Sequence, residues 1–249
     1  MEPRNIRLDL EYDGTNYAGF QIQRDQPTIQ GALDAALARL TGQTVRVFGA
    51  GRTDAGVHAT GQVVNFRTDS RLAVATMAQA LNALLPPDIV VRGGAEVDPA
   101  FHARFSARQR RYRYSIWNAE YPKAIGRQYL YQWRGPLNVA DMAEACQALV
   151  GTHDFMSFAG ATDPQSVGRS TVREVYECRC WREYEMVLVE IAANAFLPHM
   201  VRNIVGTLLQ VGIGKLPASA VPIILAARDR RQAGPTAPAQ GLCLTQVCY

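Results

Sequence analysis

Arg52 and Asp54 lie two residues apart in a glycine-rich stretch, "GAGRTDAGVHATGQVVNF", that runs from Gly49 to Phe66. A carboxylate beside a guanidinium is suited to chemistry, because the cation favours the ionised acid and restricts its direction. A simpler interpretation is a turn in which the Asp54 carboxylate accepts backbone N–H bonds and Gly56 supplies a positive φ. The connection is long and polar for a hairpin, however, and such loops often carry function. We therefore treat Asp54 as a candidate catalytic residue.

Several familiar motifs begin in this sequence and then fail. Gly49 and Gly51 open a dinucleotide fingerprint, but Asp54 occupies the third glycine position and would repel a pyrophosphate. The run Gly212–Leu216 lacks the earlier glycine and the Ser or Thr of a phosphate loop. The motifs of serine hydrolases, zinc proteases and zinc deaminases are absent, and the four histidines lie far apart. We predict no metal and no nucleotide cofactor.

The basic residues favour a nucleic-acid partner. All 26 except Lys123 and Lys215 are arginine, in a chain with a net charge of +4. Arginine offers a planar fork for phosphate and stacks on bases. The stretch "RFSARQRRYR" interleaves arginines with aromatic residues, as a surface that binds phosphates and stacks bases requires: Arg104, Phe105, Arg108, Arg110, Arg111, Tyr112, Arg113 and, next in the chain, Tyr114. A solvated strand edge is the alternative.

Composition places the chain among ordinary globular proteins. It has 249 residues, of which 48% are hydrophobic and 19% charged. No apolar run is long enough to span a bilayer, and no signal-peptide pattern opens the sequence, so we expect a cytoplasmic protein. The five cysteines form no Cys-x-x-Cys pair, and we expect reduced, mostly buried thiols.

Hydrophobic periodicity predicts strands and helices in alternation. Residues 5–13 alternate as a half-buried strand, and residues 29–41 form a helix opened by Thr28 and closed by Gly42. The other predicted strands cover residues 44–50, 61–67, 89–97, 112–117, 171–181, 186–193 and 242–249. The other predicted helices cover residues 72–85, 139–149 with Gly151 as its cap, a stretch from Pro198, and a shorter one ending near Ala227. The pattern predicts an α+β fold of two similar halves, with helices on one side of the strands.

Five stretches match one family in order and spacing. They are "EYDGTNYAGFQIQ", "GRTDAGVHATGQV", "RRYRY", "FLPHMVRNIVG" and "APAQGLCL", and they extend from the first predicted strand to the last. Together they resemble the tRNA pseudouridine synthase A family. A loop-level departure is "FAGATDPQSVGRS", residues 158–170, where the grip on tRNA could differ.

The resemblance implies a fold, a reaction and a set of site residues. The fold is two RNA-binding-like α/β-sandwich halves, residues 1–106 and 107–249, that form an extended, mainly antiparallel sheet with a central RNA-binding cleft. The activity is isomerisation of uridine to pseudouridine at positions 38, 39 and 40 of the tRNA anticodon stem-loop, by a homodimer. Asp54 is then catalytic, paired with Arg52, and Tyr112 stacks on the uracil. The implied substrate contacts are Arg202, Leu242, Arg110, Arg111 and His58, although His58 is equally suited to brace the loop.

The residue types agree with this chemistry. Pseudouridine forms when the N1–C1′ bond breaks, uracil turns and C5 bonds to C1′; the change is redox-neutral, so no cofactor is expected. An ionised Asp54 could attack C1′, add to the uracil ring or remove the 2′ proton. A stacked uridine cannot reach a carboxylate, so base flipping is expected. A tRNA-binding module without chemistry and a synthase acting at another RNA position remain as alternatives.

Overall fold

The computed structural model describes residues 3–160 and 170–249 and divides into two compact units. Unit 1 comprises Met1–Arg110 and Cys243–Tyr249, and unit 2 comprises Arg111–Leu242. Most of the loop of residues 158–170 lies outside the described residues. Within the described residues, no helix is long and apolar enough to cross a bilayer. The predicted division into domains 1–106 and 107–249 stays a prediction.

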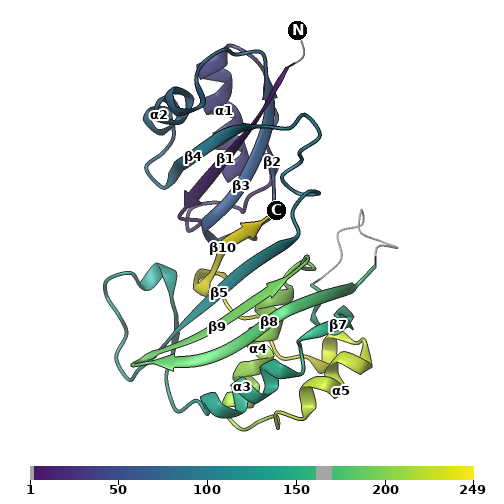
Figure 1. The fold of residues 1–249 in the computed structure, drawn as a ribbon. Coiled ribbons are helices and arrows are strands. Elements are labelled where there is room, and N and C mark those ends of the chain that lie inside the picture. The colour runs from purple at the N-terminus through teal and green to yellow at the C-terminus, as the bar shows by residue number, and fades with distance from the viewer. Residues whose placement is uncertain (1–2, 161–169) are drawn as a thin grey trace. The chain divides into compact units, whose positions relative to one another are not determined.

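Unit 1 is a sheet with two helices against one face (Figure 1). Strand β1 pairs antiparallel with β3 and β4. Strand β3 also pairs antiparallel with β2 and parallel with β10. The elements are β1 (Arg4–Tyr12), α1 (Ile29–Thr41), β2 (Phe48–Gly49), β3 (His58–Thr68), α2 (Val74–Leu84), β4 (Ile89–Val97) and, at its C-terminal end, β10 (Leu242–Cys248).

The alternation along β1 gives the sheet of unit 1 one apolar face. Ile6, Leu8 and Leu10 are almost fully buried, as are Ile29 and Leu33 of α1, so this face of the sheet forms the main core. The other face carries a smaller cluster in which Ala50, Val63 and Ala103 are covered by the partly buried side chains Phe101, Val247 and Tyr249. Both apolar layers therefore pack against β3, the strand that follows the Asp54 loop.

Unit 2 contains the strand order β5-β9-β8-β7, with β6 beside β5. Its helices α3, α4 and α5 gather together, and α3 lies on β8 (Figure 1). The elements are β5 (Gln109–Asn118), β6 (Tyr131–Trp133), α3 (Val139–Gln147), β7 (Gly151–Asp154), β8 (Val172–Glu183), β9 (Met186–Ala193), α4 (Met200–Gly212) and α5 (Ala220–Ala227). Cys146, Cys178 and Cys180 are buried here, and the cysteines are free thiols, as predicted.

The α+β class and most of the predicted elements are confirmed, with three differences. The strand predicted over residues 44–50 is wrong except at Phe48–Gly49, because Val47 bonds to side chains of α1: its N–H donates to Asp34 (3.0 Å) and its carbonyl accepts from Gln30 (2.9 Å). Gly151 does not cap α3, which ends at Gln147; instead it begins β7 with a φ of 109°. The sequence analysis predicts neither β6 nor β7.

Candidate active site

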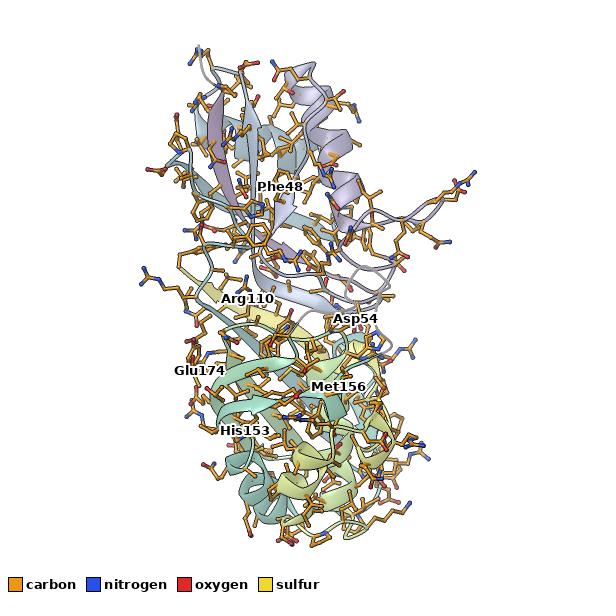
Figure 2. The ribbon with its side chains drawn as sticks, turned by 90° about the vertical axis from the view of Figure 1, so that its right-hand side faces the viewer. Phe48, Asp54, Arg110, His153, Met156 and Glu174 are labelled. Atoms are coloured by element: carbon orange, nitrogen blue, oxygen red, sulfur yellow. The ribbon has the colours of Figure 1, made fainter. Side chains whose placement is uncertain are left out.

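Asp54 lies in the connection from β2 to β3, residues 50–57, where its side chain is half-buried (Figure 2). The Val57 N–H donates to the Asp54 carbonyl (3.1 Å), and Gly56 has a φ of 75°. The positive φ predicted at Gly56 is therefore confirmed, and the bond that closes the turn runs to the backbone carbonyl of Asp54. Acceptance of backbone N–H bonds by the Asp54 carboxylate stays a prediction. A turn of this kind fixes the backbone that carries the carboxylate.

The segment after β1 holds the Asp54 loop through its backbone. The Phe20 N–H donates to the Thr53 carbonyl (3.0 Å), and the Gly56 N–H donates to the Tyr17 carbonyl (3.3 Å). These two bonds flank Asp54 on either side in the sequence. We call residues 12–20 the cradle, because they support the loop from one side of Asp54 to the other.

Two glycines allow the cradle to approach the loop closely. A Cβ atom on Gly14 would lie 2.0 Å from the carbonyl oxygen of Val57, and one on Gly19 would lie 2.7 Å from that of Thr53. Gly19 also has a φ of 105°, which L side chains rarely adopt. Backbone therefore packs directly on backbone at both ends of the turn that contains Asp54.

A buried network of hydrogen-bonded side chains fixes the start of the Asp54 loop. The hydroxyl groups of Tyr12 and Thr53 are hydrogen-bonded (2.8 Å), and Gln62 donates to the Tyr12 hydroxyl (3.3 Å) and to the Gly51 carbonyl (2.8 Å). Gln62 is fully buried and Tyr12 nearly so. Burial raises the pKa of the Tyr12 phenol, although its bonds to Thr53 and Gln62 oppose this, so Tyr12 stays protonated.

His58, the first residue of β3, braces the loop from its other end. Its ring is buried, and Nδ1 accepts a hydrogen bond from the Gly14 N–H (3.1 Å). The same nitrogen lies 3.1 Å from the Asp13 carboxylate. The structure therefore places His58 against the cradle, as the bracing interpretation predicts, while its contact with substrate stays a prediction.

Arg52 projects from the loop into solvent. The guanidinium forms no ion pair with Asp54 in the part of the chain that the structure describes. The predicted pairing of these two residues is therefore not seen here and stays a prediction.

Arg110, which the resemblance assigns to substrate binding, has a structural task in unit 1. Its side chain is buried (Figure 2), and it donates to the backbone carbonyls of Ala50 (3.0 and 3.2 Å), Ala107 (3.0 Å) and Arg104. Ala50 begins the Asp54 loop, so Arg110 ties that loop to the segment before β5. A contact between Arg110 and tRNA stays a prediction.

Tyr112 of β5 is a buried aromatic residue of unit 2. Only 7% of it is exposed, and its ring meets the Phe196 ring edge-on, with 5.1 Å between centroids. Tyr112 shares the buried face of β5 with Tyr114 and Ile116, as the alternation of the sequence predicts. The structure thus gives Tyr112 a packing role, and stacking on uracil stays a prediction.

Arg202 and Leu242 lie near the loop that precedes β10. Arg202 of α4 donates from Nε to the Ala237 carbonyl (2.8 Å), and the Ala237 N–H donates back to the Arg202 carbonyl (3.1 Å). Leu242, at the first position of β10, is buried. Neighbouring Gly241 has no room for a Cβ, because the Tyr114 ring would be 2.7 Å away.

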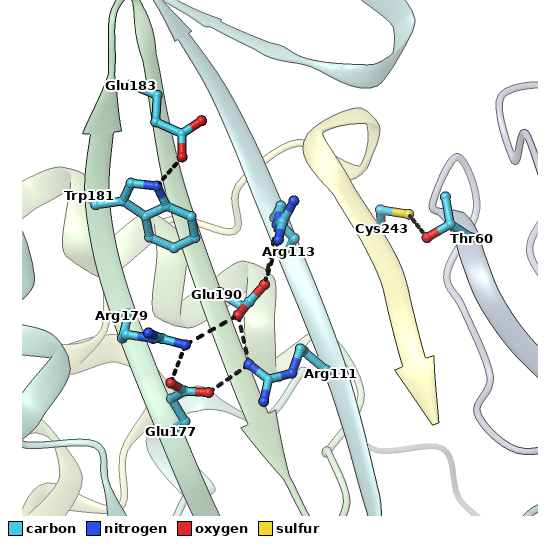
Figure 3. A network of polar contacts seen from close by, with 9 residues as sticks. All are labelled: Thr60, Arg111, Arg113, Glu177, Arg179, Trp181, Glu183, Glu190 and Cys243. Carbon is cyan, nitrogen blue, oxygen red and sulfur yellow. Dashed lines mark hydrogen bonds and ion pairs between the residues drawn. The ribbon is translucent and has the colours of Figure 1, made fainter. Parts of the chain in front are cut away.

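Arg111 belongs to an ion-pair network on the strands of unit 2 (Figure 3). It contacts Glu177 and Glu190, both at 2.6 Å, and Arg113 also binds Glu190 (3.0 Å). Burial opposes the charge of Glu190, but its bonds to Arg113 and Arg111 outweigh burial and hold the pKa of Glu190 below its usual range. Arg111 is thus engaged within the protein, and its binding of substrate stays a prediction.

The predicted site residues are shared between the two units. Asp54, Arg52, His58 and Arg110 belong to unit 1, and Tyr112, Arg202, Leu242 and Arg111 belong to unit 2. The sequence analysis assigns no role to Tyr12, Gly14, Gly19 or Gln62, which hold the Asp54 loop. Three of them, Tyr12, Gly14 and Gly19, lie in the stretch "EYDGTNYAGFQIQ" that the family resemblance includes, and this was the only signal for them in the sequence.

Comparison with known proteins identifies the family. The family model described as "tRNA pseudouridine synthase" matches residues 10–106 and 145–249. The protein named "tRNA pseudouridine synthase A" from Ruminiclostridium cellulolyticum is 49% identical over 247 residues, covering 99% of this chain and all of that protein. Proteins of the same name from Chloroflexus aurantiacus (51% identical, 99% of this chain, 89% of that protein) and Moorella thermoacetica (46%, 98% and 99%) match equally broadly.

The matched segments contain the cradle, the Asp54 loop and five of the eight predicted site residues. The other three, Arg110, Arg111 and Tyr112, fall between the two matched segments. The relatives span those three residues as well. The chain belongs to the tRNA pseudouridine synthase family.

Proposed function

We propose that this protein isomerises uridine to pseudouridine at positions 38, 39 and 40 of the tRNA anticodon stem-loop, with Asp54 as the catalytic residue. Family membership supports an isomerase that acts on tRNA. The observation that carries the assignment to Asp54 is the support of its loop: backbone bonds on both sides of Asp54, two close glycine contacts and the buried Tyr12–Thr53 pair. Catalytic groups require such fixed positions.

The reaction needs a target base outside its stack and a carboxylate that reaches it. We propose that the uridine is flipped from the stem-loop, because a stacked nucleotide cannot present C1′ or the uracil ring to a side chain. Asp54 then acts by attack on C1′, by addition to the ring or by removal of the 2′ proton. No electrons are gained or lost overall, so the proposal requires no cofactor.

The remaining residues are proposed on the resemblance and on their chemistry. Tyr112 would stack on the uracil, which is worth about 1–3 kcal/mol per base in comparable sites. Leu242, an apolar side chain, would help to exclude water while the glycosidic bond is open. Arg52 and Arg202 would hold charge near the carboxylate and the RNA backbone. A homodimer and a cytoplasmic location belong to the same proposal.

The decisive experiment measures tritium release from tRNA that carries C5-labelled uridine. Asp54→Asn should abolish release while tRNA affinity and thermal stability stay near those of the unchanged protein. Asp69→Asn, which removes an exposed carboxylate after β3 of the same unit, is the matched control and should leave release unchanged. Release that survives in Asp54→Asn would refute the assignment. Mapping of the modified uridines by carbodiimide labelling then tests positions 38, 39 and 40.

A further inference from the structure

Unit 1 carries a row of three rings, of which Phe48 and Phe105 are exposed and His102 is half-buried, with a guanidinium at each end. The centroids of Phe48 and His102 are 5.0 Å apart, and those of His102 and Phe105 are 4.5 Å apart. Arg46 lies over the Phe48 ring (5.7 Å) and Arg104 over the Phe105 ring (5.7 Å). We call these five residues the ring row.

The two phenylalanine rings of the row are open to solvent although they are large and apolar. Phe105 is 78% exposed and Phe48 39% exposed. A large aromatic side chain that stays in water does not gain the free energy that its burial would provide. Neighbouring exposed aromatic side chains therefore indicate an interaction surface. Figure 2 shows Phe48 well apart from Asp54, so the ring row is a separate feature of unit 1.

The turn that presents Phe105 is held in one shape. The Ser106 N–H donates to the His102 carbonyl (2.9 Å), and the His102 N–H donates to the Ser106 hydroxyl (3.0 Å). Arg110 binds the Arg104 carbonyl from within unit 1. Because these bonds are made without a ligand, the rings need little reordering when a partner binds.

Charge and ring chemistry together point to one class of partner. Nucleic-acid bases stack on aromatic side chains, and their phosphates bind arginine. A second copy of this chain would bring the same two guanidinium groups to a symmetric contact, where like charges repel. Burial lowers the pKa of His102, with a smaller effect from nearby Arg104, so the ring is neutral at pH 7 and stacks as an aromatic.

We propose that the ring row is a second tRNA contact, at which an unpaired base stacks on Phe105 while Arg46 and Arg104 bind the adjoining phosphates. The proposal rests on tRNA being the substrate. It adds a contact that positions the RNA from outside the catalytic loop. The row would therefore raise affinity for tRNA without taking part in bond rearrangement.

The test compares tRNA affinity among variants of Phe105 at fixed salt. Phe105→Ala should raise the Kd for full-length tRNA about 5- to 150-fold, the change expected when one base loses its stacking partner. Phe105→Leu should bind as poorly as Phe105→Ala, whereas Phe105→Trp should bind as well as the unchanged protein, because only a ring restores stacking. The control is Ile223→Ala, an exposed apolar residue on α5 of unit 2, which should leave the Kd unchanged.

Two results would overturn the proposal. One is a Kd that Phe105→Ala leaves unchanged. The other is a fall in molar mass by light scattering in Phe105→Ala, which would assign the row to a contact between copies of the chain. The readout is separate from catalysis, since kcat at saturating tRNA should not change. If the proposed reaction is wrong, the unchanged protein releases no tritium. The effect of Phe105 on tRNA binding is measured independently of that result.

Discussion

Gly14 offers the sharpest test of how the cradle supports catalysis. In Gly14→Ala the new Cβ would lie 2.0 Å from the Val57 oxygen and 2.7 Å from the Val57 carbonyl carbon. Contacts below 3.0 Å are essentially never tolerated, so the cradle and the loop must separate by about 1 Å. Both atoms are backbone, and no side chain can rotate away. The displaced residue is three positions after Asp54.

The expected cost follows from that displacement. Inserting a methyl group into a packed region costs about 1–3 kcal/mol of stability. A misplacement of about 1 Å at a reacting group lowers the rate of catalysis about 100-fold. We therefore expect Gly14→Ala to fold, to bind tRNA and to show a kcat about 100-fold lower in single-turnover tritium release.

Gly93→Ala is the matched control for Gly14→Ala. Gly93 lies on β4 in the same unit, and nothing lies within 4 Å of the position that its Cβ would take. This variant should keep the kcat of the unchanged protein. If Gly14→Ala retains a kcat within about threefold of Gly93→Ala, the cradle does not position Asp54 and the argument from rigid support fails.

Tyr12→Phe removes the hydroxyl group that bonds to Thr53 and should destabilise the protein by about 1–3 kcal/mol, seen as a lower urea midpoint; equal stability would count against the buried network of hydrogen-bonded side chains. Burial raises the pKa of Asp34 from 3.8 to about 6, although its bond to Val47 opposes this, so the folded chain binds an extra proton between these values. The free energy of unfolding therefore falls as pH rises through that window. Asp34→Asn should remove this dependence on pH and add about 1 kcal/mol of stability at pH 7, which is less than the whole pKa shift would give because the carboxyl is partly exposed. Urea unfolding at a series of pH values measures this, and the same dependence on pH in Asp34→Asn would contradict the prediction. Glu190→Gln leaves Arg111 with a weaker partner and should cost about 1–3 kcal/mol in thermal denaturation, with less loss at high salt; an unchanged Tm would show that the network adds no stability.

Local signals in the sequence were enough to predict most helices and strands. Thr28 caps α1 by accepting from the Gly31 N–H (3.2 Å), and Gly42 ends it with a φ of 70°. Both residues are recognisable because capping depends on the chemistry of single side chains. The prediction failed around Val47, whose partners Asp34 and Gln30 lie on a helix and satisfy its backbone in place of a strand. No pattern within residues 44–50 reveals that choice.

The candidate site was predictable in its residues but not in its supports. Asp54 and Gly56 stand out as types in a polar loop, and the structure confirms the turn that Gly56 permits. The contact between Tyr12 and Thr53 joins residues that are 41 positions apart. Only tertiary structure brings such a pair together. Likewise Arg110 reads as a surface cation in the sequence, whereas the fold buries it among backbone carbonyls.

The pairing of β10 with β3 has a consequence for the order of folding. Cys243 and Leu244 lie beside His58 and Ala59, at the end of the Asp54 loop, and Gly61 packs against the Thr245 carbonyl. Unit 2 is made on the ribosome between the two parts of unit 1. The sheet beside the loop therefore cannot close until β10 has emerged, so the nascent chain holds its candidate catalytic aspartate in an incomplete unit throughout the synthesis of unit 2.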